Sequence, residues 1–124
     1  MKAVSTKVPV LNALVYFRDP ASNDDPEIDG KKRPRIWATS SCVAAGCLPD
    51  SEGDTEIVMG PSGDVTPDKQ LLFDGSLETP SRRLIAELVV DREILRVEVP
   101  NTITHLQIWT DGTNASERIT VGID

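Results

Sequence analysis

Side chains that catalyse reactions or hold metal ions are scarce in this 124-residue chain. Its only histidine is His105 and its only cysteines are Cys42 and Cys47, while phosphate-binding, dinucleotide-binding, G-x-S-x-G and H-E-x-x-H motifs are all missing. A zinc site would need two ligands besides the cysteines, and His105 is the only remaining residue of a suitable kind. The sequence therefore predicts no catalytic residue, no metal site and no cofactor.

Long apolar runs are also missing. The longest span only a few residues, such as 88–90, and residues 1–9 lack the apolar stretch of a signal peptide. The shares of hydrophobic residues, 39%, and of charged residues, 27%, are those of an ordinary globular protein. We therefore expect a single domain over residues 1–124 that lies in the cytoplasm and does not bind a membrane.

Residues that favour β-structure are abundant. There are 12 valines, 9 isoleucines and 10 threonines, against 10 leucines and 8 alanines, and branching at Cβ suits the pleated surface of a sheet. Nine prolines and eight glycines interrupt the chain too often for long helices. Short apolar runs separated by turn residues are typical of a sandwich or barrel. The sequence predicts an all-β fold, an antiparallel β-sandwich of about seven or eight strands.

The expected strands follow the apolar runs. A long loop is expected over residues 19–34, which lack periodicity and contain two prolines. Asp74-Gly75 interrupts one apolar run, and we interpret it as a bulge. The predicted strands cover residues 8–18, 35–43, 55–59, 70–78, 83–90, 94–99, 103–110 and 117–123.

One segment leaves an alternative open. Ser81 is a common helix-capping residue, and Leu84 and Leu88 have the spacing of neighbours on one face of a helix. An α+β domain with one short helix over residues 81–94 is therefore the second possibility for the fold.

Charge is distributed unevenly along the chain. Residues 1–43 contain seven basic and five acidic residues, whereas residues 44–124 contain six basic and fifteen acidic ones. Phosphate groups repel so acidic a surface, so direct binding of nucleic acid is disfavoured. The one basic cluster, residues 31–35, follows an acidic stretch, and we expect the two to cancel at range. A protein partner with a basic surface, in contrast, would be attracted.

Four carboxylates occupy every second position between Asp50 and Glu56. In an extended chain alternate side chains share one face, so these four would project together, about 6.6–6.8 Å apart. That spacing is close to twice the phosphate repeat of about 3.4 Å in a nucleic-acid strand. Trp109 and Asp111 lie near the end of another strand, and tryptophan is enriched at protein interfaces. The predicted partner-binding residues are Asp50, Glu52, Asp54, Glu56, Trp109 and Asp111.

Two other classes of function remain open on the residues alone. A small enzyme would rest on a dyad of Cys42 and His105. A calcium-dependent or carbohydrate-binding module would use acidic loops, because carboxylate oxygens at alternate positions can bind Ca²⁺. The candidate calcium ligands are Asp24, Asp25, Glu27 and Asp29 in one loop, and Asp50, Glu52 and Asp54 in another.

The second half of the chain resembles a known family. The residues that carry the resemblance, within 71–123, are Phe73-Asp74-Gly75-x-Leu77-x-x-Pro80-Ser81-x-x-Leu84, Val97-x-Val99-Pro100, Ile108-Trp109-x-Asp111 and Ile119-x-Val121. They are similar to the bacterial competence-nuclease-inhibitor (ComJ-like) family and to small β-sandwich immunity proteins encoded beside toxins. The resemblance implies a β-sandwich without catalysis that binds and blocks a partner protein, typically a nuclease or toxin. We therefore expect an acidic, bacterial immunity or inhibitor protein whose partner has a basic surface.

Overall fold

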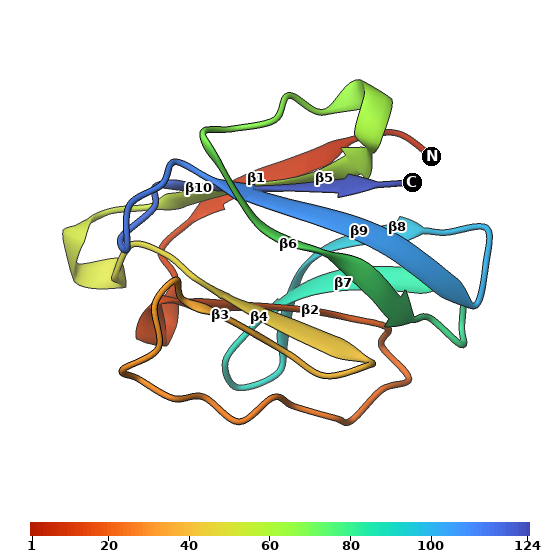
Figure 1. Cartoon of the computed structure of the whole chain (residues 1–124), viewed down its shortest axis with the longest axis horizontal. Helices are drawn as coiled ribbons and strands as arrows, with labels where there is room; N and C mark the ends of the chain where they lie inside the picture. Colours follow the sequence, from red (N-terminus) through yellow and green to blue (C-terminus); the bar gives the residue numbers. More distant parts are fainter.

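The computed structural model describes residues 1–124 and contains ten strands in two five-stranded sheets. The β10 sheet has the strand order β1-β5-β10-β9-β6, and the β2 sheet has the order β3-β4-β2-β7-β8 (Figure 1). The strands are β1 Val4–Val8, β2 Leu14–Arg18, β3 Ile36–Ala38, β4 Cys42–Gly46, β5 Thr55–Pro61, β6 Gln70–Glu78, β7 Arg83–Leu88, β8 Arg92–Glu98, β9 Ile103–Thr110 and β10 Arg118–Ile123. Three short 3-10 turns are the only helical segments: η1 Leu11–Ala13, η2 Asp50–Glu52 and η3 Ser62–Asp64.

The predicted all-β sandwich is confirmed. Twenty buried residues form one hydrophobic cluster between the two sheets. Strand β9 shows how the pattern works, because Leu106 and Ile108 are fully buried while His105 and Gln107 on the other face are only half-buried. The alternative helix over 81–94 is wrong, since β7 and β8 occupy that segment as an antiparallel pair. No helix here has the length and apolarity needed to cross a membrane.

The predicted strand over 8–18 is in fact two elements in two different sheets. After β1, Asn12 and Ala13 in η1 adopt positive φ values of 59° and 54°, which redirect the chain. Asparagine tolerates this left-handed conformation better than most residues. The apolar pattern does not reveal the turn, because Leu11 is apolar although the structure leaves it exposed.

The predicted strand over 35–43 is also divided, into β3 and the start of β4. The Thr39 hydroxyl accepts hydrogen bonds from the backbone N–H groups of Ser41 and Cys42 and closes a short hairpin between them. These two divisions account for ten strands where eight were expected. The sandwich is also not wholly antiparallel, because β5 and β10 pair in parallel.

The predicted bulge lies in the expected strand but at another position. The pairing of β6 with β9 shifts register between Leu71 and Phe73, whereas Asp74 and Gly75 stay in regular pairing. The shift turns Leu71 outward, opposite Trp109.

The outer faces of the two sheets are covered differently. The long loop between β2 and β3, along the bottom of Figure 1, packs Ile28 against a small cluster of Leu14, Trp37 and Ala44 on the β2 sheet. The connection from β5 to β6 crosses in front of β10 and β9 (Figure 1), and a Cβ added at Gly122 would lie 3.4 Å from Ser62. Beyond this crossover, the outer face of the β10 sheet carries polar and charged side chains together with Leu71 and Trp109.

Candidate functional site

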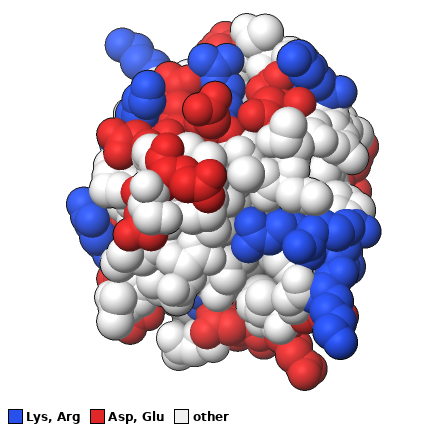
Figure 2. All heavy atoms as spheres, turned by 90° about the vertical axis from the view of Figure 1, so that its left-hand side faces the viewer, with Lys and Arg blue, Asp and Glu red and all other residues white.

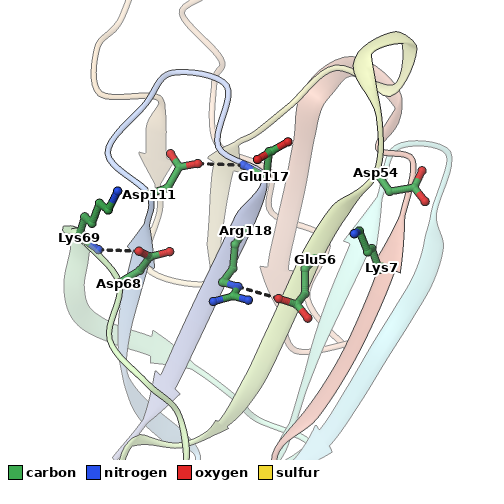
Figure 3. A pocket seen from close by; sticks show the side chains of 8 residues that line it. All are labelled: Lys7, Asp54, Glu56, Asp68, Lys69, Asp111, Glu117 and Arg118. Carbon is green, nitrogen blue, oxygen red and sulfur yellow. Dashed lines mark hydrogen bonds and ion pairs between the residues drawn. The ribbon is translucent and has the colours of Figure 1, made fainter.

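The largest pocket lies where β1, β5 and β10 meet the loop between β9 and β10, at the left-hand end of Figure 1. Its volume is about 440 Å³, and none of the residues that line it is hydrophobic. Five carboxylates and three cations form its walls, and we call it the acidic cleft. Its residues, shown in Figure 3, are Lys7, Asp54, Glu56, Asp68, Lys69, Asp111, Glu117 and Arg118.

Asp111 shapes the loop that borders the cleft. Its Oδ1 accepts hydrogen bonds from the backbone N–H and the hydroxyl of Thr113, at 2.9 and 2.7 Å, and its Oδ2 accepts one from the Glu117 N–H at 3.2 Å. Burial alone would raise the pKa of Asp111, but these hydrogen bonds outweigh it and lower that pKa. The carboxylate is therefore charged at neutral pH, with most of its hydrogen-bonding capacity used inside the loop.

Glu56 and Arg118 form the floor between the two walls. They lie opposite each other in the parallel pair of β5 and β10, and Arg118 Nε donates to Glu56 Oε1 at 2.6 Å. Both side chains are partly exposed, so water screens this ion pair and its contribution to stability is about 0–1 kcal/mol. The main effect of the pair is to cancel the charge in the middle of the cleft, because its contribution to folding stability is small.

Asp54 and Glu117 are the carboxylates that the fold leaves free. Both are exposed, and neither side chain takes part in an ion pair or a hydrogen bond. Figure 3 shows Asp54 beside Lys7 at one wall, with Lys69 at the opposite wall. Neither lysine forms an ion pair in the structure. The cleft thus presents free carboxylates that are able to accept ammonium or guanidinium groups from another molecule.

The structure brings together three of the six predicted partner-binding residues. Asp54, Glu56 and Asp111 all line the acidic cleft. Trp109 lies on the outer face of the β10 sheet, half-buried, across from Leu71 and Thr120. Asp50 and Glu52 lie outside the cleft, in the turn η2 that precedes it.

The prediction that the four carboxylates lie in one extended segment is wrong. Residues Asp50–Glu52 form a 3-10 turn, and Gly53 follows with a φ of 140° that L side chains rarely adopt. Only Glu56 of the four lies within a strand. Alternation in the sequence predicted a shared face, but that inference holds only where the backbone is extended.

Five residues of the cleft were not predicted from the sequence: Lys7, Asp68, Lys69, Glu117 and Arg118. Glu117 and Arg118 begin the predicted strand that follows the turn after Asp111. This proximity in sequence to a predicted site residue is the one local signal that indicated them. Lys7 had none, because its neighbour across the sheet is Glu56 and that pairing joins distant segments.

The cysteines and the histidine do not form the dyad that an enzyme would need. Cys42 pairs with Arg18 in the β2 sheet and is fully buried, whereas His105 lies on the outer face of the β10 sheet, on the other side of the core. Burial raises the pKa of Cys42 to about 12 and that of Cys47 to about 11, so neither free thiol ionises at neutral pH. The alternative of a Cys/His enzyme is therefore wrong.

The carboxylates of the acidic loop between β2 and β3 contact different partners and do not converge. Asp24 accepts a hydrogen bond from the Ser41 hydroxyl, Asp25 pairs with Arg18, and Asp29 accepts one from the backbone N–H of Lys31. Nowhere do three or more histidine, cysteine or acidic side chains come together as a metal site. The structure does not assemble either of the two predicted sets of calcium ligands.

His105 instead joins a polar network on the outer face of the β10 sheet. Its Nδ1 lies 2.6 Å from Asp124 Oδ2 and its Nε2 lies 2.5 Å from Asp74 Oδ1. The Ser62 hydroxyl donates to the other oxygen of Asp124 at 2.6 Å. The hydrogen bonds to Asp124 and Asp74 raise the pKa of His105. The serine contacts the aspartate and not the histidine, so this arrangement does not activate a nucleophile.

Comparison with known proteins identifies the fold. The crystal structure of ComJ, inhibitor of the DNA-degrading activity of NucA from Bacillus subtilis, superposes with a TM-score of 0.70 over 97% of this chain and 93% of ComJ, at 11% sequence identity. The chain has the ComJ fold. A second solved structure, named as crocagin biosynthetic gene J, matches with a TM-score of 0.47 at 11% identity over 98% of this chain and 95% of that one. No family model and no curated protein matches the sequence.

The resemblance to the ComJ-like family drawn from residues 71–123 is confirmed at the level of the fold, and the structural match extends it to the first half of the chain. An identity of 11% reflects shared architecture.

Proposed function

We propose that this protein is a non-catalytic inhibitor of the immunity type, which neutralises a nuclease or toxin with a basic surface by binding it through the acidic cleft. The observation that carries the proposal is a cleft walled only by charged side chains, in which Asp54 and Glu117 have no partner inside the protein. The similarity to ComJ, which inhibits a DNA-degrading enzyme, supports an inhibitory role.

The proposed mechanism is electrostatic mimicry of the substrate. An enzyme that cleaves nucleic acid binds phosphates with lysine and arginine side chains. The free carboxylates of the cleft occupy those cations and exclude the substrate backbone. With a net charge of −7, the whole chain is attracted to a basic partner, and complementary charge raises the association rate toward about 10⁸ M⁻¹s⁻¹ at low salt. The encounter is proposed to take place in the bacterial cytoplasm, where Cys42 and Cys47 remain thiols.

The proposal is tested by inhibition and binding assays with two enzymes: NucA, which ComJ inhibits, and the product of any toxin or nuclease gene that neighbours this one. We expect the protein to lower DNA cleavage by at least one of them. The double variant Asp54→Lys/Glu117→Lys should slow association at least tenfold at low salt, with an unchanged melting temperature, because both side chains are exposed.

The matched control is Glu78→Lys/Glu98→Lys. Both residues are exposed and form no ion pair, and they lie outside the cleft, so this variant has the same net charge as the cleft variant. If both double variants slow association equally, overall charge and not the cleft governs binding. If the protein inhibits neither enzyme, the proposed function is wrong.

A further inference from the structure

A second pocket opens next to the acidic cleft. Its volume is about 280 Å³, and Asn114 and Ala115 line it from the same loop whose residues Asp111 and Glu117 line the cleft. The walls combine apolar groups, Ile28, Pro49 and the Trp37 ring, with the guanidinium groups of Arg33 and Arg35. We call it the basic pocket. Figure 2 views the molecule from this end and shows acidic side chains with basic ones among them in the upper part, a run of basic side chains below, and further acidic side chains at the bottom.

The basic side chains of residues 31–35 form no ion pair inside the protein, although Glu52 lies in the wall of the pocket. Lys31, Lys32, Arg33 and Arg35 are four cations within five residues, and none of them forms an ion pair in the structure. The sequence predicted that the preceding acidic stretch would cancel them. None of its four carboxylates forms an ion pair with the cluster: Asp24 contacts Ser41, Asp25 contacts Arg18, Asp29 accepts from the backbone N–H of Lys31, and Glu27 has no partner.

Backbone carbonyls hold the two arginines in place. Arg33 Nη1 donates to the carbonyls of Gly30 and Lys32 at 2.9 and 2.8 Å. The Arg35 guanidinium lies 5.9 Å from the centre of the Trp37 ring and donates to the carbonyls of Cys47 at 3.3 Å and of Asn114 and Ala13 at 3.4 Å each. Each guanidinium has five N–H groups, so donors remain for an incoming acceptor. Groups already held in position lose little entropy when they bind.

Trp37 forms an apolar part of the wall. Its side chain lines the pocket and the residue is only 6% exposed, yet the indole N–H has no hydrogen-bond partner. A buried donor without an acceptor is uncommon and costs about 1–3 kcal/mol. The indole nitrogen itself has almost no accessible surface, so the ring serves the pocket as an apolar wall and not as a hydrogen-bond donor.

We propose that the basic pocket binds a carboxylate side chain of the partner protein, so that the interface has two arms of opposite charge. This inference rests on the proposed function and specifies the chemistry of the partner: a surface with cations for the acidic cleft and an acidic side chain beside them. A nuclease that binds a metal ion presents this combination, because carboxylates that hold the metal lie beside cations that bind phosphate.

Charge favours a protein carboxylate over a nucleic-acid strand as the occupant. Glu52 lies at the wall of the pocket, and the acidic cleft begins on the other side of the loop. A nucleic-acid strand carries a phosphate about every 3.4 Å and would run from the basic pocket into those carboxylates. A single acidic side chain needs only the pocket.

The test uses Trp37 as its own reporter. The variant Trp109→Phe leaves Trp37 as the only tryptophan, because the chain has two. Titration of this variant at low salt with a short peptide that carries one glutamate between lysines should give a saturable change in tryptophan fluorescence. Adding Arg33→Glu should raise the dissociation constant at least tenfold. Arg92→Glu, an equally exposed change of the same charge at the far hairpin of β7 and β8, should leave it within twofold.

Results of three kinds would overturn the inference. One is the absence of a saturable signal, or an equal loss of binding in the Arg33→Glu and Arg92→Glu variants. Another is tighter binding of a hexathymidine oligonucleotide than of the peptide, which would make the pocket a nucleic-acid site. The third is self-association at low salt that Arg33→Glu abolishes, because the occupant would then be a second copy of this chain.

The peptide titration uses no nuclease, so its outcome is separate from that of the proposed function. If an inhibited nuclease is found, Arg33→Glu should weaken its binding in addition to the effect of the cleft variant, whereas Arg92→Glu should not. Inhibition that is insensitive to Arg33→Glu would leave the proposed function intact and remove the second arm.

Discussion

Arg18 and His105 each lie between two carboxylates on the outer face of a sheet, but only Arg18 is buried. Arg18, in the β2 sheet, is within 2.5 Å of Asp25 and 3.2 Å of Glu87, and its side chain is 10% exposed under the long loop. His105, in the β10 sheet, lies between Asp74 and Asp124 with a side chain that is 38% exposed.

The difference shows that exposure to solvent determines how much a cation between two carboxylates contributes to folding stability. Burial raises the pKa of Glu87 despite the attraction of Arg18, and the Nε of Arg18 has no acceptor at all. Removing one member of a buried group leaves an uncompensated charge, which costs several kcal/mol, whereas exposed pairs contribute about 0–1 kcal/mol. We therefore expect the β2 sheet to depend on its charged residues for stability, and the β10 sheet to be free to use its own for binding.

The largest effect is expected from Arg18→Met. The variant leaves the Glu87 side chain buried without its cation, and we expect a loss of about 3–5 kcal/mol in the free energy of unfolding, measured in urea. Arg83→Met, at an exposed position on neighbouring β7, should stay within about 0.5 kcal/mol of the original. Adding Glu87→Gln to Arg18→Met should recover part of the loss. A loss below about 1 kcal/mol for Arg18→Met would show that burial is not decisive.

The next effect concerns the anchor of the covering loop. Asp19 is fully buried and accepts hydrogen bonds from the N–H groups of Ala21 and Ser81, both at 2.8 Å, and from the Ser81 hydroxyl at 2.6 Å. Asp19→Ala leaves these donors without an acceptor and should lower the free energy of unfolding by about 2 kcal/mol. Asp24→Ala, in the same loop but exposed, should cost less than about 0.5 kcal/mol in the same urea titration.

A smaller, pH-dependent effect is expected at the exposed group. The raised pKa of His105 means that its contribution to stability is complete below the unfolded value of about 6.5 and disappears as pH rises through the folded value. The hydrogen bonds from Ser62 and His105 lower the pKa of Asp124, whose contribution is present above about pH 3.8 and disappears as pH falls through its folded value.

The chain should therefore exceed the His105→Gln variant in stability by at most about 1 kcal/mol, and most strongly between about pH 4 and 6.5. Thermal unfolding of both proteins from pH 3.5 to 9 measures this difference. A difference that does not change with pH would contradict the assignment of His105 as the titrating group.

The smallest expected effect is a difference in salt dependence between the Arg18 group and the His105 group. Raising the salt concentration from about 0.1 to 1 M shortens the Debye length from about 10 to 3 Å, which screens exposed charges much more than buried ones. The effect of His105→Gln at pH 5.5 should then fall to nearly zero, while that of Arg18→Met should change by only a few tenths of a kcal/mol. Equal salt sensitivity in urea titrations would mean that Arg18 is hydrated in solution.

Local sequence predicted the second half of the chain well. The ranges expected for 70–78 and 103–110 coincide with β6 and β9, and 117–123 differs from β10 by one residue. In β10 apolar side chains alternate through the strand, in β9 they do so at Leu106 and Ile108, and turn residues mark the strand ends, so neighbouring residues contain the necessary information. The first half was less well predicted because β3 has only three residues and the turn after β1 contains an apolar residue, Leu11.

The sequence by itself determined the fold class, the acidic balance and the scarcity of catalytic groups, because these depend on composition and on the two-residue period of strands. Only the tertiary structure decided which charges meet. Arg118 reaches Glu56 across 62 residues of chain, and the parallel pairing of β5 with β10 that joins them leaves no local pattern. The free carboxylates of the cleft and the unpaired arginines beside it follow from such distant contacts, since a charged side chain is neutralised or left available by what lies near it in space.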